Sequence, residues 1–347
     1  MSKNDNAPPG ADYAEARRGW GEAGLSPLWE SAVAHKPDAD RFRARHWRWS
    51  DLQKPIGEAM TLVSPEHVER RVLLFADPAL SQPGRPTSSR TMNAGLQILM
   101  PGERARPHRH SLDAIRLVLT GEGAMTVVNG RECHMVPGDL ILTPGGAWHE
   151  HVHNGDKPVV WLDGLNGPLH RFLGTASFEP GPISGELPAD NGNPFVDSTL
   201  APDVLDEAQG ASPIFRYAYK QVAAALEAAP VQAGGFRRVT YVNPVTRQNA
   251  IPLMDLWAMQ LEPGIRTRPF SSNASMICVA LDGHGRTTFG DQTIEWGPKD
   301  IFILPQDAWM RHEAVSGPAR LFVLSDREVY RRLGLLKESF GNEAGSH

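Results

Sequence analysis

The sequence predicts an all-β fold of two barrels, each a double-stranded β-helix of the jelly-roll kind, with a helical N-terminal arm and a helix between the barrels. From residue 70 onward, short apolar and β-branched runs alternate with turns rich in Gly and Pro, which is typical of barrels and sandwiches. The second half also repeats the first, because residues 101–107 align with residues 263–269 at an offset of 162 residues. A chain of 347 residues is long enough for two such cores.

Residues 1–60 are expected to form the helical arm. Residues 11–18 and 27–34 have the composition of short helices. The Trp-rich stretch 46–49 predicts an arm that packs on something larger, and aromatic packing explains it better than a binding motif does.

Residues 61–175 are expected to form the first barrel. Its strands are predicted at 71–75, 92–100, 115–119, 124–128, 140–142 and 159–162. Residues 176–230 are expected to be a linker and a helix, since the stretch up to 211 is rich in Gly, Pro, Asp and Ser. Ser212 and Pro213 then supply an N-cap and a first-turn Pro for a helix that ends before Pro230.

Residues 231–330 are expected to form the second barrel, and residues 331–347 a C-terminal tail. Within the repeat, Gly121 and Gly123 match Gly283 and Gly285. Beyond this point the second copy is one residue shorter, and its matching pairs are Asp139 and Asp300, Pro144 and Pro305, and Trp148 and Trp309.

The charge balance favours a small-molecule partner. The chain has 35 Lys and Arg against 40 Asp and Glu, whereas nucleic acids and anionic membranes select basic patches. No apolar run reaches the length of a membrane span or has the form of a signal peptide, so we expect a cytoplasmic protein with no nucleic-acid or membrane partner. Cys133 and Cys278 are too few for a disulfide framework and are expected to be small buried hydrophobes.

Three histidines carry the strongest chemical signal. His108 and His110 differ by two positions, so on a strand their side chains leave the same face, and His149 arrives from a second strand. Three neutral imidazoles can hold a first-row transition metal and leave coordination positions open for chemistry. The simpler alternative is a barrel with buried structural histidines.

The second barrel is expected to lack this site. Phe270, Ser272 and Met310 stand at its ligand positions, and none of them suits a divalent metal in that geometry. His312, which matches His151, is expected to be structural. One metal per chain, in the first barrel, is therefore predicted.

The spacing resembles that of the cupin family and identifies the repeat as a bicupin. The resemblance rests on Gly102, Gly121, Gly138, Pro144 and Gly146 around the three histidines. Many cupins carry a glutamate ligand where this chain has Ala114, and an Asn where it has His153. A site with three histidines and no carboxylate resembles the iron dioxygenases of the family more than its manganese or zinc isomerases.

Within the bicupins, the chain resembles gentisate 1,2-dioxygenase and its salicylate-cleaving relatives. The motifs that carry this resemblance are residues 94–97 (AGLQ), 108–110 (HRH), Arg116, 148–151 (WHEH) and 161–165 (WLDGL). The resemblance implies Fe(II), one ion per chain in the N-terminal barrel. It also implies dioxygen and a small aromatic hydroxy acid as partners, ring cleavage between the carboxyl-bearing and hydroxyl-bearing carbons, and a homotetramer.

Arg116 is the expected partner of the substrate carboxylate. It lies inside the apolar run 115–119, where a charge is costly without an anion, and a guanidinium pairs with a carboxylate in a bidentate manner. An internal pair with Asp113 or Asp163 is the alternative. Asp113 could also ligate a metal, but it faces away from His110 on a regular strand.

His151 lies two residues beyond His149 and is expected to point into the barrel without being a ligand. It would hydrogen-bond the substrate hydroxyl or move its proton, since histidine titrates near neutral pH. The resemblance adds Gly95, Gln97 and Asp163 to the pocket, with Arg71 or its neighbour Arg70 as a second cationic contact.

Two departures from the family pattern concern the pocket wall. Residues 145–147 (GGA) and Asn93 stand where relatives carry bulkier side chains, so Asn93 and Gly146 are expected to line a wider pocket. This favours a salicylate with a 5-substituent such as nitro or halogen beside gentisate itself. A cupin isomerase with another divalent metal, or a non-catalytic ligand-binding bicupin, remain alternatives that elemental analysis separates.

Overall fold

The computed structural model describes residues 11–27, 44–64, 68–181, 212–304 and 306–341. The chain divides into two compact units, Met1–Phe42 and Arg43–His347. In the first unit, helix α1 (Ala11–Glu22) covers and extends the helix expected over 11–18, and Tyr13 packs edge-on against Trp20 with ring centroids 5.7 Å apart. Apart from Pro27, the helix expected over 27–34 lies outside the described residues.

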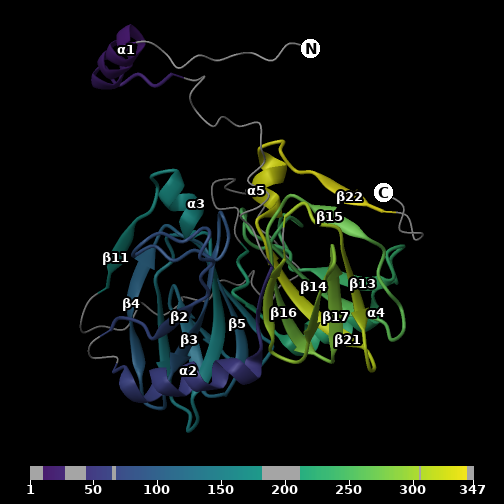
Figure 1. Cartoon of the computed structure of the whole chain (residues 1–347). Coiled ribbons are helices and arrows are strands. Elements are labelled where there is room, and N and C mark those ends of the chain that lie inside the picture. The colour runs from purple at the N-terminus through teal and green to yellow at the C-terminus, as the bar shows by residue number, and fades with distance from the viewer. Residues whose placement is uncertain (1–10, 28–43, 65–67, 182–211, 305, 342–347) are drawn as a thin grey trace. The chain divides into compact units, whose positions relative to one another are not determined.

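The second unit contains two jelly-roll barrels, each made of two antiparallel sheets (Figure 1). The strands of the first barrel are β2 (Val72–Leu74), β3 (Asn93–Leu99), β4 (Arg104–His110), β5 (Ala114–Thr120), β6 (Ala124–Val128), β7 (Arg131–His134), β8 (Leu140–Thr143), β9 (His149–His153), β10 (Val159–Leu165), β11 (Phe178–Pro180) and β12 (Arg216–Tyr217). Their order is β12-β8-β5-β10-β3-β2 in one sheet and β11-β4-β9-β6-β7 in the other.

The second barrel repeats this plan. Its strands are β1 (Arg45–Trp47), β13 (Phe236–Thr240), β14 (Asp255–Leu261), β15 (Phe270–Ser272), β16 (Met276–Asp282), β17 (Gly285–Phe289), β18 (Gln292–Trp296), β19 (Ile301–Leu304), β20 (Met310–Ala314), β21 (Ala319–Ser325) and β22 (Glu338–Phe340). Their order is β1-β19-β16-β21-β14-β13 in one sheet and β18-β17-β20-β15-β22 in the other. The all-β prediction and the duplication are both confirmed.

The two barrels touch through the outer faces of their six-stranded sheets. A Cβ on Gly164 of β10 would lie 2.5 Å from Leu324 Cδ2 of the second barrel, so the two barrels approach each other closely at this glycine. The side chain of Thr91 also donates a hydrogen bond to Asp326 across the same junction. Strand β5 is buried on both faces for this reason, which explains why its sequence is an almost continuous apolar run.

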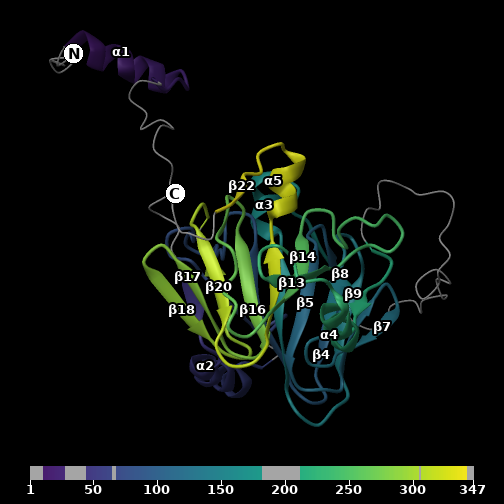
Figure 2. The ribbon, with the colours of Figure 1, turned by 90° about the vertical axis from the view of Figure 1, so that its right-hand side faces the viewer.

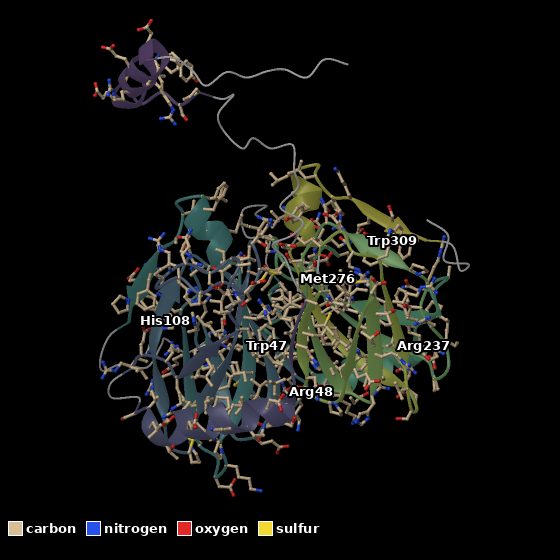
Figure 3. The ribbon with its side chains drawn as sticks, in the orientation of Figure 1. Trp47, Arg48, His108, Arg237, Met276 and Trp309 are labelled. Atoms are coloured by element: carbon tan, nitrogen blue, oxygen red, sulfur yellow. The ribbon has the colours of Figure 1, made fainter. Side chains whose placement is uncertain are left out.

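Helix α2 (Trp49–Leu62) lies at the end of the unit opposite α3 (Gly167–Phe172) and α5 (Arg327–Arg332) (Figures 1 and 2). It buries Leu52, Ile56 and Ala59, which share one helical face. Just before it, β1 pairs with β19, and Trp47 packs on Phe75 of the first barrel with ring centroids 4.6 Å apart (Figure 3). Residues 44–62 therefore pack with the barrels, and the arm expected over 1–60 is too long.

The other expected boundaries also need correction. Strand β11 pairs with β4 although it lies beyond residue 175, and β22 pairs with β15 although it falls in the expected tail 331–347. Helix α4 (Tyr219–Ala228) begins seven residues after Ser212, because the intervening strand β12 is held extended by β8. Its first N–H donates to Asp139 Oδ1 at 2.9 Å, so the barrel rather than Ser212 caps the helix.

The repeat register corrects one expected match. Ala124 begins β6 opposite His153, and Gly285 begins β17 opposite Ala314. Gly285 thus corresponds to Ala124 and not to Gly123, which means that the missing residue lies in the turn before this strand.

Candidate metal centre and substrate pocket

Three histidines converge inside the first barrel. One ring nitrogen of each lies within 4.8 Å of the others, which makes a potential metal-binding group among the described residues. His108 and His110 lie two positions apart on β4, and His149 begins β9 opposite His108 in the antiparallel ladder. Figure 3 shows His108 within this barrel. The strands therefore bring together the residues that the spacing predicts as ligands.

The surroundings of these rings suit a divalent metal. Nδ1 of His110 lies 2.8 Å from the Leu112 carbonyl oxygen and Nδ1 of His149 lies 3.0 Å from that of Ala147, so both rings can donate there and leave Nε2 free. Nε2 of His149 is buried and has no hydrogen-bond partner among the described residues. Burial lowers the pKa of His110 to about 4, and nearby Arg116 adds to this effect. Neutral imidazoles with free Nε2 lone pairs are the ligands that first-row metals prefer.

Arg70, not Arg71, faces the histidines. Its Nη2 contacts Nδ1 of His108 and donates to the Arg106 carbonyl oxygen at 3.0 Å. Burial lowers the pKa of Arg70 to about 10, with the nearby charge of Arg116 contributing. Arg71 instead forms a two-pronged ion pair with Glu103 at 2.8 and 2.9 Å and donates to the Val63 carbonyl oxygen. The expectation that Arg71 contacts the substrate is therefore wrong, because its donors are used inside the fold.

Arg116 lies on the interior face of β5 and is held on two sides. Its Nε is 3.5 Å from Asp163 Oδ1, and its Nη1 donates to the hydroxyl of Thr143. Asp163 in turn accepts a hydrogen bond from Trp161 Nε1 at 2.9 Å. The internal pair with Asp163 that the sequence left open is present. Nη2 of Arg116 makes no hydrogen bond within the described part of the chain, so its N–H groups remain available for a ligand.

Asp113 has a structural position. Its carboxylate accepts hydrogen bonds from the Gly145 N–H and from Asn166 Nδ2, each at 2.9 Å. It therefore fixes the loop before β9 rather than ligating a metal, as its place on the strand predicts.

His151 is fully buried beside the cluster. Nδ1 lies 2.9 Å from Thr126 Oγ1, and the ring centroid lies 5.0 Å from that of Trp161. Its Nε2 is buried without a partner among the described residues. Burial lowers the pKa of His151 well below its usual value, and Arg116 adds to this. A neutral imidazole with one unused nitrogen is thus available near the three clustered histidines.

Strand β3 carries three more of the expected pocket residues. Asn93, Gly95 and Gln97 alternate along one face of β3, opposite Leu165, Asp163 and Trp161 of β10. Oδ1 of Asn93 is buried without a partner among the described residues. Gly95 has a packing reason, since a Cβ there would lie 2.9 Å from the Leu73 carbonyl oxygen of the neighbouring strand β2.

A cavity of about 500 Å³ opens beside His110. Its lining consists of Arg109, His110, Ser111, Gly145, Gly146, Ser177, Phe178 and Glu179. Gly146 has a positive φ of +81°, and a Cβ there would meet nothing within 4 Å. Gly145 does not widen the pocket, because its Cβ would lie 2.3 Å from the Ser111 carbonyl oxygen. Backbone packing therefore explains Gly145, whereas Gly146 lies next to open space.

Sequence reasoning missed two side chains of this site. Thr143 ends β8 and contacts Arg116, and Phe178 of β11 packs on His108 with ring centroids 5.1 Å apart. Thr143 could have been found from its repeat partner, since Leu304 occupies the matching place in β19. Phe178 lies in a segment with a linker's composition, and only the pairing of β11 with β4 brings it to the metal cluster.

The first of the two jelly-roll barrels contains the buried three-histidine group, which is the one candidate metal centre among the described residues. This fold and this site define the class of the protein as a bicupin. Comparison with known proteins supports this class, because the cupin domain model matches residues 95–164.

More specific similarity covers nearly the whole chain. Gentisate 1,2 dioxygenase 1 of Aquipseudomonas alcaligenes is 35% identical over 91% of this chain and 92% of its own. The 5-aminosalicylate 1,2-dioxygenase of Comamonas sp is 31% identical over 94% of this chain and 89% of its own length. The crystal structure of salicylate 1,2-dioxygenase from Pseudoaminobacter salicylatoxidans with gentisate superimposes with a TM-score of 0.86 at 28% identity, covering 99% and 98% of the two chains. The chain therefore belongs to the gentisate and salicylate 1,2-dioxygenase family of ring-cleaving oxidoreductases.

None of the described helices is both long enough and apolar enough to cross a bilayer.

Proposed function

We propose that this protein is an Fe(II)-dependent dioxygenase that opens the ring of gentisate or a 5-substituted salicylate between the carboxyl-bearing carbon C1 and the hydroxyl-bearing carbon C2. The observation that carries the proposal is the group of His108, His110 and His149 with Arg70 and Arg116 beside it. Three histidines leave room on an octahedral ion for a chelating hydroxy acid and for dioxygen, which iron would activate.

Arg116 and Arg70 would hold the carboxylate of the substrate. Both guanidinium groups are cations in a buried setting, where an anionic ligand is strongly favoured. Asp163 lies 3.5 Å from Arg116, and the carboxylate of Glu69 acts on Arg70, so these acidic groups offset part of the positive charge. The carboxylate of a ring acid would pair with the guanidinium N–H groups that the protein leaves free.

His151 would contact the ring hydroxyl. Thr126 Oγ1 also lies 3.5 Å from Met135 Sδ and donates to it, so the threonine oxygen can accept from Nδ1 of His151. Nε2 then has a lone pair that can accept the phenolic proton when the substrate chelates the metal.

The pocket wall supports a 5-substituent larger than hydroxyl. Gly146 leaves its Cβ position open, and Asn93 offers a carboxamide whose Oδ1 is unpaired among the described residues. An amide can donate to a nitro or hydroxyl oxygen at the far side of the ring. Gln97 and Asp163 lie farther along the same wall.

The test is oxygen uptake by the Fe(II)-loaded protein with gentisate, salicylate, 5-nitrosalicylate and 1-hydroxy-2-naphthoate. We expect ring-opened product in step with oxygen consumption and one iron per chain. A different tightly bound metal, with no oxygen uptake on any of the four acids, would overturn the proposal. Cleavage of gentisate alone would exclude the 5-substituted salicylates.

We further propose a homotetramer in the cytoplasm. Exposed apolar side chains on α3 and just after α5, Phe172 and Leu333 among them, support self-association, and the two buried free cysteines suit a reducing compartment. Light scattering of the purified protein measures the assembly directly.

A further inference from the structure

A buried polar trio lies behind the metal centre. Arg116, Asp163 and Thr143 have exposed fractions of 3%, 5% and 0%. Asp163 approaches the Nε side of the guanidinium at 3.5 Å, and the Thr143 hydroxyl accepts from Nη1 on the other side. Asp163 therefore lies near Nε without accepting a hydrogen bond from it, Nη1 donates to Thr143, and Nη2 makes no hydrogen bond to the described residues.

The second barrel shows that the fold does not need this trio. Cys278 and Val323 pair across β16 and β21 as Arg116 and Asp163 pair across β5 and β10. Leu304 pairs with Met276 as Thr143 pairs with Ala114. The three replacements are buried in the apolar core of that barrel. Since buried polar groups can often be exchanged for apolar ones without loss of stability, folding alone does not explain why the first barrel keeps all three.

The geometry points to a positioning role for Thr143. A guanidinium and a carboxylate prefer a bidentate pair through two nitrogens, but Asp163 lies 3.5 Å from Nε and accepts no hydrogen bond from it. The hydrogen bond to Thr143 fixes the opposite end of the guanidinium. Without it, Arg116 is free to rotate toward Asp163 and to commit Nη2 to that carboxylate.

We propose that Thr143 is a positioning residue that keeps Arg116 out of a bidentate pair with Asp163, so that Nη2 is directed at the carboxylate of the aromatic acid. This inference rests on the proposed function, because it assumes that the ligand of Arg116 is a ring acid. Thr143 would contact neither the metal ligands nor the substrate and would act only through Arg116.

The experiment compares Thr143→Val, which keeps the shape and removes the hydroxyl, with Thr143→Ser, which keeps the hydroxyl. Thr120→Val, at the end of β5, is the matched control. Salicylate binding is measured by calorimetry on the Fe(II)-loaded proteins without oxygen, together with iron content and Tm. We expect Thr143→Val to raise the Kd about tenfold or more, the range for a lost hydrogen bond to a charged group, and Thr143→Ser and Thr120→Val to stay near wild type.

A second ligand separates positioning from general damage. Catechol chelates a metal without a carboxylate, so Thr143→Val should leave its Kd unchanged while salicylate binding weakens. Equal losses for both ligands, a loss of iron, or a wild-type Kd for salicylate would each overturn the proposal. If Thr143→Val folds poorly, Thr143→Ala against Thr143→Ser gives the same comparison. A wild type that binds salicylate but opens no ring refutes the proposed function alone, whereas ring opening with an unaffected Thr143→Val refutes only the role of Thr143.

Discussion

The interiors of the two barrels differ in polarity at matching positions. Where the first barrel is polar, the second has apolar or weakly polar side chains: His108 and Phe270, His149 and Met310, Arg116 and Cys278, Thr143 and Leu304, Asp163 and Val323. A histidine bonded to a threonine occurs in both, at 2.9 Å for His151 and 2.8 Å for His312. That bond therefore belongs to the barrel. His151 differs from His312 in its position beside the other histidines, since its ring centroid lies 6.3 Å from that of His149.

Replacing His149 with Ala should remove most of the bound iron, because two ligands from one strand cannot close the site. His312→Ala is the matched control in the second barrel and should keep one iron per chain. Elemental analysis of both purified proteins checks this. Stoichiometric iron in His149→Ala, or two irons in the wild type, would contradict the assignment.

Neighbouring arginines should behave in opposite ways. Arg71→Ala leaves Glu103 without its buried partner and should lower the free energy of unfolding by about 3 kcal/mol. Arg70→Ala should leave stability nearly unchanged and raise the KM of the ring acid, since Arg70 faces the histidines. Urea unfolding and steady-state kinetics on both variants separate the two effects. Reversed behaviour would mean that Arg71 turns into the pocket in solution.

The clustering of the candidate ligands was predictable because strand alternation decides which side chains share a face, and the spacing of His108 and His110 is local. The choice between Arg70 and Arg71 was not, since it depends on Glu103, which lies 32 residues away along the chain. Gly95 and Gly145 misled for a similar reason. From the sequence alone, a glycine that is required by close packing against a neighbouring backbone cannot be distinguished from a glycine that widens a pocket.

At the scale of elements, the short strand β11 completes the wall of the site. Phe178 packs on His108, and on the outer face Glu179 pairs with Arg109 at 2.6 Å. This exposed ion pair contributes little, so β11 is held mainly by its backbone ladder to β4. The next residue, Gly181, extends that contact by donating to the Pro107 carbonyl oxygen at 2.8 Å.

Gly181→Ala should loosen this strand, because the new Cβ would lie 2.6 Å from the Pro107 carbonyl oxygen. We expect Phe178 to move away from His108 and the KM of the ring acid to rise, with iron retained through the unaffected ladder of β4 and β9. Gly57→Ala in α2, where a Cβ meets nothing within 4 Å, is the control. An unchanged KM in Gly181→Ala would show that Phe178 is not part of the substrate wall.

The long strands were predictable from apolar periodicity, but β11 and β12 were not. Both lie in or next to a segment of loop-like composition, and both are extended because a barrel strand pairs with them. The start of α4 was misplaced for the same reason, since its cap comes from Asp139 of the barrel and not from the preceding turn. Local signals fail where a distant partner decides the backbone.

At the scale of the whole molecule, a buried carboxyl group joins the two barrels. Asp326 of the second barrel accepts hydrogen bonds from the Thr91 hydroxyl of the first barrel and from the Ser275 N–H at 2.7 Å. In the first barrel, Asn166 holds the matching place and bonds the N–H and the carboxylate of Asp113. An uncharged amide thus stands in the first copy at the position where the second copy has an ionisable group.

This difference predicts a pH dependence of stability. Burial raises the pKa of Asp326 to about 6, above the value of about 4 in an unfolded chain, so the folded state binds the proton more tightly. Its contribution is fully present below pH 4 and is lost as the pH rises to 6 and beyond, with a total change of about 1–3 kcal/mol. Asp326→Asn copies the first barrel and removes this titration. The Tm of the variant should therefore exceed that of the wild type at pH 7.5 by more than it does at pH 4.5. Both proteins are compared in the same metal state, so that the contributions of the other titrating groups to the Tm difference cancel. An equal Tm difference at the two pH values would mean that Asp326 is not neutralised by burial at the joint between the barrels.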